Sequence, residues 1–254
     1  MNRKLIATAL GAVMALSFTG CGDDDEEGGA GAATTAKATD IDGAGVRLLK
    51  GAAVSYTGSS VRESTFAYNE DGSLKTQDGV DFAVFCAEVG AEFNSQGYLS
   101  RTAFSDENDY ETSAFDYDGD GHLTRCYMTE EWEEEGEKGY WSSEVKFTWK
   151  NGLLTTIRCE EDGSLYYETS IEYSDVDNKH LQPAFVDGDW EPTQPFVLMG
   201  KGPKKLPSEI RYVEYYNGKK QYDRTLKVSF AVDTEGLIKS CTAGGKTYQY
   251  TYTK

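Results

Sequence analysis

Three aspartates at alternate positions suggest a site for a hard cation. They are Asp116, Asp118 and Asp120, and Gly121 follows them directly. The pattern matches the first half of a calcium-binding loop, in which alternating carboxylates converge on one ion. The position of the bidentate glutamate in such a loop is held here by Tyr127. A solvated hairpin turn is therefore the default interpretation, and a calcium site is the alternative.

The side chains that could perform acid–base or nucleophilic catalysis do not indicate a particular catalytic site. The chain has only two histidines, His122 and His180, so a Ser-His-acid or Cys-His site would have to use one of them. The 43 acids could supply the carboxylate pair that a glycosidase uses, but in so acidic a chain such a pair can occur anywhere. The acidic cluster at 130–137 is expected to be an exposed hairpin tip. We therefore predict no catalytic residue.

Aromatic side chains form the third group that could bind a ligand. The chain has 17 tyrosines and four tryptophans, most of which we expect to pair across strands and fill the core. An exposed Trp or Tyr on a sheet face can also stack against a sugar ring or a protein partner. Three tryptophans lie near predicted loops and are the candidates for stacking: Trp132, Trp141 and Trp190.

A nine-residue unit recurs along the chain and indicates what positions these side chains. Each copy has a strand residue, a polar trio, a glycine in seventh place and an aliphatic residue in ninth place. The copies occupy residues 66–74, 91–99, 115–123, 157–165 and 230–238. Glycine tolerates the positive φ that a hairpin loop requires, and Asn or Asp before it starts the turn. Asp118 and Asp120 fall in this turn, and two-residue turns are predicted at Asn151-Gly152 and Asn217-Gly218.

The segments between the turns read as antiparallel strands. Residues 144–149 and 166–173 alternate with period two and are rich in Tyr, Phe, Thr and Val, and no helical periodicity follows the N-terminal segment. All five prolines lie within 183–207, so 177–207 is predicted to be a long irregular connection, either a structural lid or a binding loop. We predict an all-β fold, a single antiparallel meander of repeated hairpins forming a large curled sheet or partly closed barrel.

The N-terminus has the features of a signal peptide. Arg3 and Lys4 precede an apolar stretch at 5–16, which is too short to span a bilayer, and Gly20 lies directly before Cys21. We therefore predict three parts. They are a lipoprotein signal peptide at 1–20, a lipidated cysteine with a flexible acidic tether at 21–45, and the antiparallel β domain at 46–254.

The net charge of the chain limits the classes of partner that it can bind. The net charge is -18 and becomes -20 when residues 1–20 are removed, because Arg3 and Lys4 leave with them. This balance argues against nucleic acid and suits divalent cations or neutral partners such as glycans.

Four cysteines follow Cys21, and they allow either two disulfides or buried thiols: Cys86, Cys126, Cys159 and Cys241. They lack CxxC spacing, so no metal is assigned to them.

The segment around Cys21 resembles a bacterial lipoprotein signal, in which the peptide is cut before the cysteine and lipid is attached to it. Phe18 departs from the usual aliphatic residue three places before the cysteine. The acidic run that follows is similar to the export signal of Bacteroidetes surface lipoproteins, and a solvated linker is the alternative. This run consists of Asp23, Asp24, Asp25, Glu26 and Glu27.

Together with the hairpin units and the segment 200–207, these features resemble a family of uncharacterised Bacteroidetes surface lipoproteins with a porin-like antiparallel β fold. The hairpins are also similar to the tyrosine–aspartate repeats of Rhs-type shells. The resemblance implies a fold and a location, namely an outer membrane to which the chain is lipid-anchored at Cys21 and from which it faces the exterior. The family has no established activity, so the resemblance implies no catalytic residue and no cofactor.

These observations favour a binding or structural module for a glycan, a peptide or a partner protein. The alternative is a carboxylate-dependent glycan hydrolase. A flat or grooved aromatic face would favour the binding module, whereas a deep pocket with a close pair of acids would favour the hydrolase.

Overall fold

The computed structural model describes residues 49–56, 62–70, 73–106, 109–134, 136–181 and 200–252. The predicted signal peptide, the tether with Cys21 and its acidic run, and Trp190 lie outside the described residues.

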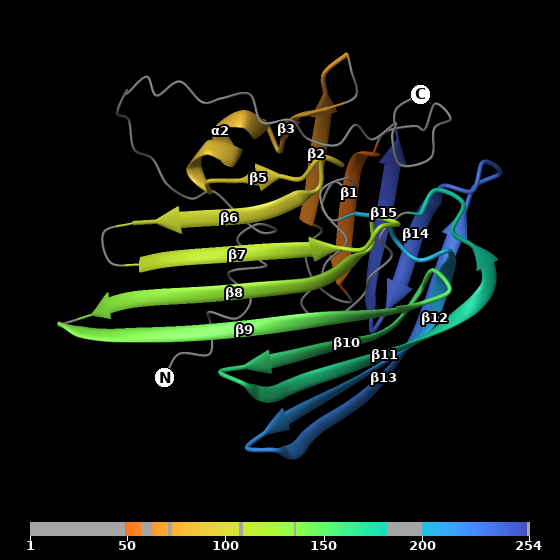
Figure 1. The fold of residues 1–254 in the computed structure, drawn as a ribbon. Helices are drawn as coiled ribbons and strands as arrows, with labels where there is room; N and C mark the ends of the chain where they lie inside the picture. The colour runs from red at the N-terminus through yellow and green to blue at the C-terminus, as the bar shows by residue number, and fades with distance from the viewer. Residues whose placement is uncertain are drawn as a thin grey trace.

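The described chain forms one antiparallel sheet of fifteen strands and one short helix (Figure 1). The strands are β1 (Leu49–Tyr56), β2 (Arg62–Tyr68), β3 (Leu74–Gln77), β4 (Val80–Asp81), β5 (Glu92–Phe93), β6 (Leu99–Ser105), β7 (Asp109–Tyr117), β8 (Leu123–Glu134), β9 (Glu137–Lys150), β10 (Leu153–Glu161), β11 (Ser164–Asp177), β12 (Lys205–Tyr216), β13 (Lys219–Val232), β14 (Ile238–Ala243) and β15 (Lys246–Tyr252). The predicted all-β meander of hairpins is confirmed.

The sheet stays open, and its free edges are consecutive in the chain. Because β1 pairs with β15, the strand order runs β4-β3-β2-β1-β15 and then back through the meander to β5. The edge strands β4 and β5 have only two residues each, which limits the backbone left for edge-to-edge pairing. The helix α2 (Phe82–Glu88) connects these two edges and buries Phe82 and Cys86 against the core. Of the two predicted shapes, the curled open sheet is the one observed.

The helix α2 was not predicted, because its seven residues are too few to show a helical periodicity. Its start does carry a local signal, however. Asp81 lies at the N-cap and accepts hydrogen bonds from the backbone nitrogens of Ala83 at 2.8 Å and Val84 at 3.4 Å.

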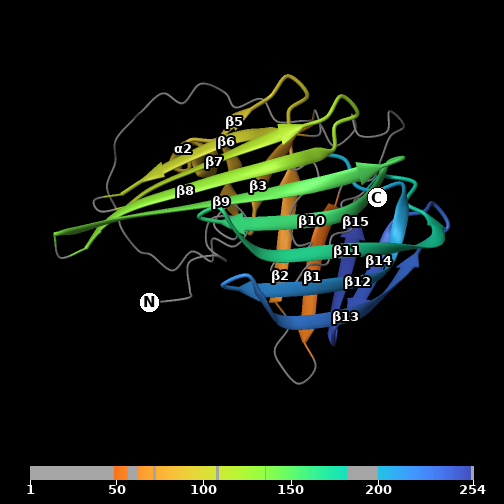
Figure 2. The same ribbon diagram turned by 60° about the horizontal axis from the view of Figure 1, so that its bottom comes forward.

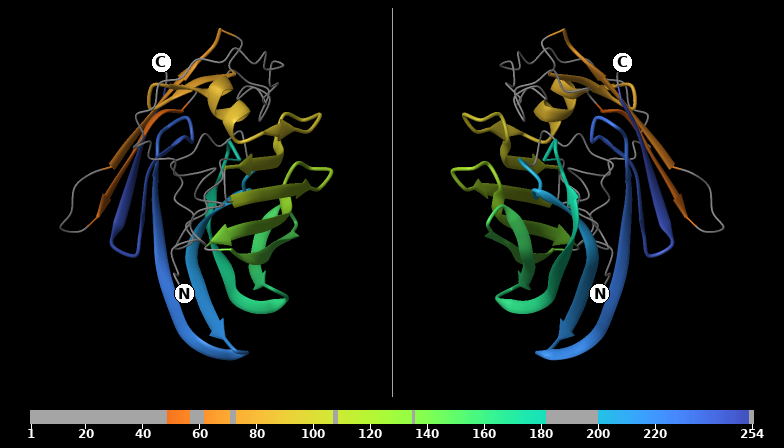
Figure 3. Two further views of the ribbon diagram at one scale, coloured as in Figure 1. Left: turned by 90° about the vertical axis from the view of Figure 1, so that its left-hand side faces the viewer. Right: turned by 90° about the vertical axis from the view of Figure 1, so that its right-hand side faces the viewer.

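The sheet curls so that its two halves face each other across one hydrophobic core (Figure 3). Strands β6–β13 lie side by side, and β1, β2, β14 and β15 cross them at a steep angle (Figures 1 and 2). We call the face that carries the core the inner face. Its most deeply buried aliphatic side chains lie on β8, β10 and β12: Leu123, Leu154, Ile157, Leu206 and Ile210.

The outer face of β7–β10 carries a continuous row of ion pairs. The row runs in the order Asp116, Arg125, Glu144, Lys146, Glu160, Arg158, with the shortest contact at 2.6 Å between Arg125 Nε and Glu144 Oε1. Exposed pairs of this kind add little stability individually, but every acid in the row has a basic partner.

Within the described residues, no helix is both long and apolar enough to cross a bilayer.

Three of the repeated units form the same turn. Asn94, Asp118 and Asp233 each accept, through one side-chain oxygen, hydrogen bonds of 2.9–3.0 Å from the backbone nitrogens two and four residues later. The glycine that follows three residues after each has a positive φ, as predicted. The unit at 157–165 differs: a register shift between Cys159 and Glu160 leaves a two-residue turn at 162–163.

The predicted Asn-Gly turns are also confirmed. Asn151 and Gly152 have φ values of 55° and 74°, and Asn217 and Gly218 have 49° and 69°. The flanking residues pair directly in each case, as a two-residue hairpin turn requires.

The long connection is fixed at both of its ends. β11 ends at Asp177 and β12 begins at Lys205, close to the predicted bounds. Asn178 is buried, its backbone nitrogen donates to the Lys204 carbonyl at 2.8 Å, and its Nδ2 donates to the Pro203 carbonyl at 2.8 Å. The middle of the connection lies outside the described residues.

The four cysteines of the domain are buried thiols, and none is in a disulfide. Burial raises the pKa of Cys86 to about 12, with a further contribution from the charge of Asp81, and burial raises that of Cys241 to about 12 as well. The thiolate is the reactive form of cysteine, so these side chains serve as core residues. Of the two alternatives left open by the sequence, the structure therefore has the thiols.

Candidate functional site

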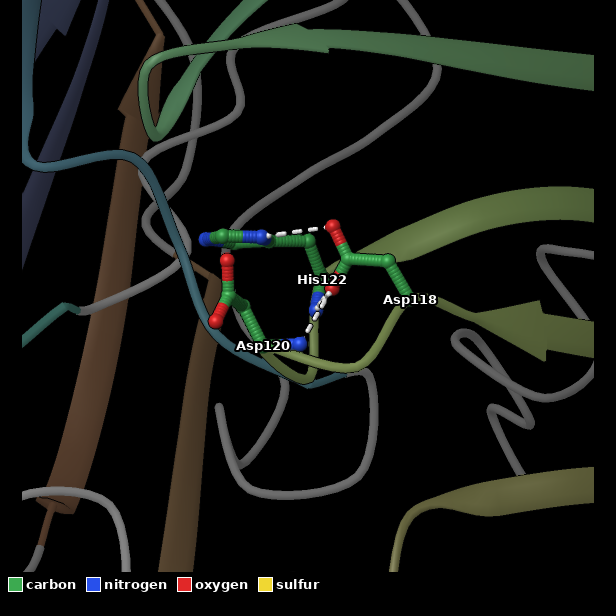
Figure 4. Close-up of side chains that lie close together, drawn as sticks. All are labelled: Asp118, Asp120 and His122. Carbon is green, nitrogen blue, oxygen red and sulfur yellow. Dashed lines mark hydrogen bonds and ion pairs between the residues drawn. The ribbon is translucent and has the colours of Figure 1, made fainter.

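The turn between β7 and β8 is the first candidate site, and Asp118 organises it (Figure 4). Its Oδ1 accepts from the backbone nitrogens of Asp120 at 3.0 Å and His122 at 2.9 Å, while its Oδ2 lies 2.9 Å from His122 Nδ1. Partial burial raises the pKa of Asp118, but the hydrogen bonds from the backbone and ring of His122 outweigh it and leave that pKa below its ordinary value. Asp118 is therefore held as a carboxylate.

His122 is buried at the base of this turn. Its ring stacks on Trp149 with a centroid distance of 4.2 Å, and Trp149 Nε1 donates to the Leu123 carbonyl at 2.7 Å. The ring position of His122 is thus set by the core on one side and by Asp118 on the other.

The three aspartates do not converge. Asp116 lies on β7, and its carboxylate faces Arg125 on the outer face at 3.5 Å. Asp118, Asp120 and His122 instead offer one ligand atom each, all within 4.8 Å of one another. This nitrogen-and-oxygen set would suit a borderline metal ion better than calcium, which takes six to eight oxygen ligands. Calcium binding here stays a prediction.

The sister turns account for the geometry of this trio. Asn94 and Asp233 make the same backbone hydrogen bonds, and the residues equivalent to His122 are Tyr98 and Leu237, which are buried as well. The turn therefore forms with or without a histidine, and its role as a hairpin connection explains Asp118 fully.

A pair of substitutions at this turn tests that interpretation. Asp118→Ala removes the acceptor of two backbone hydrogen bonds and should lower the free energy of unfolding by about 1–2 kcal/mol. Asp118→Asn keeps an acceptor in the position that Asn94 uses, so it should cost less than half as much. Chemical denaturation measures both. Asp120→Ala is the control, and a loss equal to that of Asp118→Ala would contradict the interpretation.

The second candidate site is a patch on the inner face of β6–β10, at the edge of the core, against which Trp141 packs. The strand register aligns one row across four strands, in which each residue lies opposite the next: Phe104, Glu111, Glu130 and Trp141. Trp132 lies on the same face of β8, two residues beyond Glu130, and its ring covers Gly139 so closely that a Cβ there would lie 2.0 Å from Cε2. We call these five residues together with Glu161 the inner patch.

The two glutamates at the centre of the row are crowded. Burial raises the pKa of Glu111, and the nearby charges of Glu130, Asp109 and Asp106 raise it further. Burial also raises the pKa of Glu130, with a contribution from Asp109. Like charges directly opposite each other on adjacent strands destabilise a sheet. The ionised carboxylates of the patch therefore repel one another.

Glu161 adds a third half-buried carboxyl group to the inner patch. It lies at the end of β10 opposite Ser143, in the row next to that of Trp141. Its Oε1 is buried and has no hydrogen-bond partner within the described residues. Burial raises the pKa of Glu161 to about 7, and the charges of Asp162 and Glu214 contribute.

The two faces of the same strands therefore differ in their charges. The acids Asp116, Glu144 and Glu160 on the outer face all contact Arg or Lys. On the inner patch, the charged groups that act on the glutamates are other acids, and within the described residues no Lys, Arg or His forms an ion pair with them.

The raised pKa of Glu161 predicts a specific dependence of stability on pH. The native state keeps the proton up to about pH 7, whereas the unfolded chain releases it near pH 4.5. Stability should therefore fall as pH rises between these values. Glu161→Gln should leave stability nearly unchanged at pH 4 and raise it by on the order of 1–2 kcal/mol at pH 8, after screening at this half-buried site.

Thermal unfolding from pH 4 to pH 8 measures this difference. Glu160→Gln, one residue away on the outer face, is the matched control and should not stabilise the protein. Equal stabilities of Glu161→Gln and the parent at pH 8 would contradict the assignment.

Comparison with known proteins adds information on the fold. No protein-family model matches the chain, and no curated protein matches it. Among solved structures, a porin-like protein from Bacteroides vulgatus aligns with a TM-score of 0.55 and 13% identity, over 82% of this chain and 99% of that one. This chain therefore has a porin-like antiparallel β fold. A porin-like protein from Bacteroides uniformis aligns with a TM-score of 0.39 and 13% identity, over 81% of this chain and 98% of that one, which is too low to add to the argument.

The structure places two of the three predicted aromatic residues on one surface and shows which acids accompany them. Trp132 and Trp141 lie on the same face of neighbouring strands, while Trp190 lies outside the described residues. Glu130 belongs to a cluster expected to be an exposed tip, yet it is half-buried beside Trp141. Its spacing from the core residues Cys126 and Met128 is the signal that could have placed it inside, because side chains two apart on a strand share a face.

Proposed function

We propose that this chain is a lipid-anchored outer-membrane protein, facing the cell exterior, whose inner patch binds a glycan, a peptide or a partner protein. The observation that carries the binding function is the inner patch itself, where aromatic rings flank carboxylates that form no ion pair with any basic side chain of the described residues. The location is supported by the features of residues 1–27, by the resemblance to Bacteroidetes surface lipoproteins, and by the fold shared with a porin-like Bacteroides protein.

The patch suits binding because it combines two kinds of recognition on one sheet face. Trp132 and Trp141 are half-buried, and Phe104 is 39% exposed, so their rings offer apolar surface to a ligand. The glutamates between them supply polar contacts that fix the orientation of a ligand. The sheet holds all of these side chains, so little ordering is required on binding.

One observation favours the alternative of a glycan hydrolase. Glu161 combines a pKa raised to about 7 with a second carboxylate, Glu214, that acts on it electrostatically. A proton-donating acid near neutral pH beside an ionised partner is the arrangement that glycosidases use. Glu161→Gln would then abolish turnover and leave binding intact, whereas a binding module would show no turnover in either protein.

A glycan and peptide array, probed with full-length protein, tests the binding function. Trp141→Ala should weaken binding of any ligand found by about tenfold, because it removes a stacking surface from the patch. Tyr140→Ala is the matched control, since Tyr140 is 55% exposed on the outer face of the same strand, where its hydroxyl lies 3.5 Å from that of Tyr127. Equal binding by both variants, or an array without a ligand, would contradict the proposal.

Substitution of the anchor tests the location separately. Cys21→Ser removes the sulfur to which lipid is attached, so the variant should leave the membrane fraction, while Cys86→Ser, a buried thiol, should stay membrane-bound. Protease added to intact cells should digest the parent protein. Membrane attachment of Cys21→Ser, or digestion of the parent only after lysis, would overturn the proposed location.

A further inference from the structure

Within the part of the chain that the structure describes, no basic side chain forms an ion pair with the acids of the inner patch. On the outer face, Asp116, Glu144 and Glu160 form ion pairs with Arg125, Lys146 and Arg158. The charged groups that raise the pKa values of Glu111, Glu130 and Glu161 are other acids. Crowded, half-buried carboxylates are unfavourable, and a cation placed among them would relieve both their repulsion and their loss of solvent. The charge of the patch is therefore complementary to a basic ligand.

The aromatic neighbours indicate what kind of cation fits. Both tryptophans are neighbours of Glu130: Trp132 lies two residues along β8, and Trp141 lies directly opposite on β9. The face of a tryptophan attracts ammonium and guanidinium groups, and it also covers the hydrocarbon part of a Lys or Arg side chain. A bare metal ion would gain nothing from these rings, so the patch fits an organic cation.

The extent of the patch indicates the size of the ligand. The row from Phe104 to Trp141 crosses β6–β9, and Glu161 extends the patch to β10. Four strand spacings correspond to about 19 Å along the sheet. A single amine cannot span this distance, whereas an extended peptide of about six residues can. Three separate carboxylates along such a path match several basic side chains on one chain.

From the carboxylates, the tryptophan rings and the length of the inner patch, we propose that it binds an extended, arginine- or lysine-rich segment of a partner protein. This inference rests on the proposed function, because it assumes that the patch is the ligand surface. The glutamates pair with the basic groups, and the tryptophans cover the side-chain stems between them.

The test is fluorescence anisotropy with full-length protein and a labelled eight-residue peptide of alternating Arg and Ser, at about 150 mM salt to screen non-specific attraction. The double variant Glu111→Gln/Glu130→Gln should weaken binding by at least about tenfold. The matched control Glu144→Gln/Glu160→Gln removes the same charge from the outer face of neighbouring strands and should stay within about twofold of the parent. Glu130→Gln alone provides a second variant if the double variant is poorly folded.

The possible results separate this inference from the proposed function. Equal weakening by the inner and outer variants would mean general attraction to an acidic protein and would overturn the inference. Binding of peptides of alternating Gln and Ser as tightly as the basic one would overturn it as well. If the basic peptide does not bind but the array reveals a ligand whose binding depends on Trp141, the inference of a basic ligand is wrong and the proposed function stands. If neither binds, the proposed function fails too.

Discussion

The alternation of side chains along paired strands ties the candidate ligand surface to the hydrophobic core. Val145 and Phe147 on β9 are buried, and their positions require Trp141 and Ser143 to point to the same face. A slip of one residue would exchange the two faces of a strand and expose the core. The packing of the core therefore also holds the row from Phe104 to Trp141 in place.

This arrangement explains why one sheet tolerates two different charge patterns. The outer face can carry many acids because basic side chains lie between them and water surrounds them. The inner patch carries fewer acids, but burial and mutual repulsion make them costly to the free protein. Natural proteins depart from favourable packing mainly where function requires it. The patch is such a departure, while the Asp118 turn is not, because its hydrogen bonds recur in turns without a histidine.

Much of this fold could be predicted from local sequence patterns. The candidate site could not, because it depends on pairing between strands that are distant in the sequence. The Asx-Gly units and the Asn-Gly pairs determine their own turns, so the meander could be derived from residues close in sequence. The pairing of β1 with β15 joins segments about two hundred residues apart, which no local pattern encodes. The inner patch has the same origin, since Glu111, Glu130 and Glu161 come from three strands. Asp116 separates from Asp118 because a register shift follows it at the end of β7.

The most direct measurement of the central claim follows the tryptophan indole N–H signals by NMR while the alternating Arg-Ser peptide is added to the full-length protein. Trp132 and Trp141 lie on the inner patch, whereas Trp149 donates its Nε1 hydrogen to the Leu123 carbonyl at the core. If the inner patch is the ligand surface, the signals of Trp132 and Trp141 shift and that of Trp149 stays in place. Unmoved signals from both patch tryptophans at peptide concentrations that saturate binding would contradict the account.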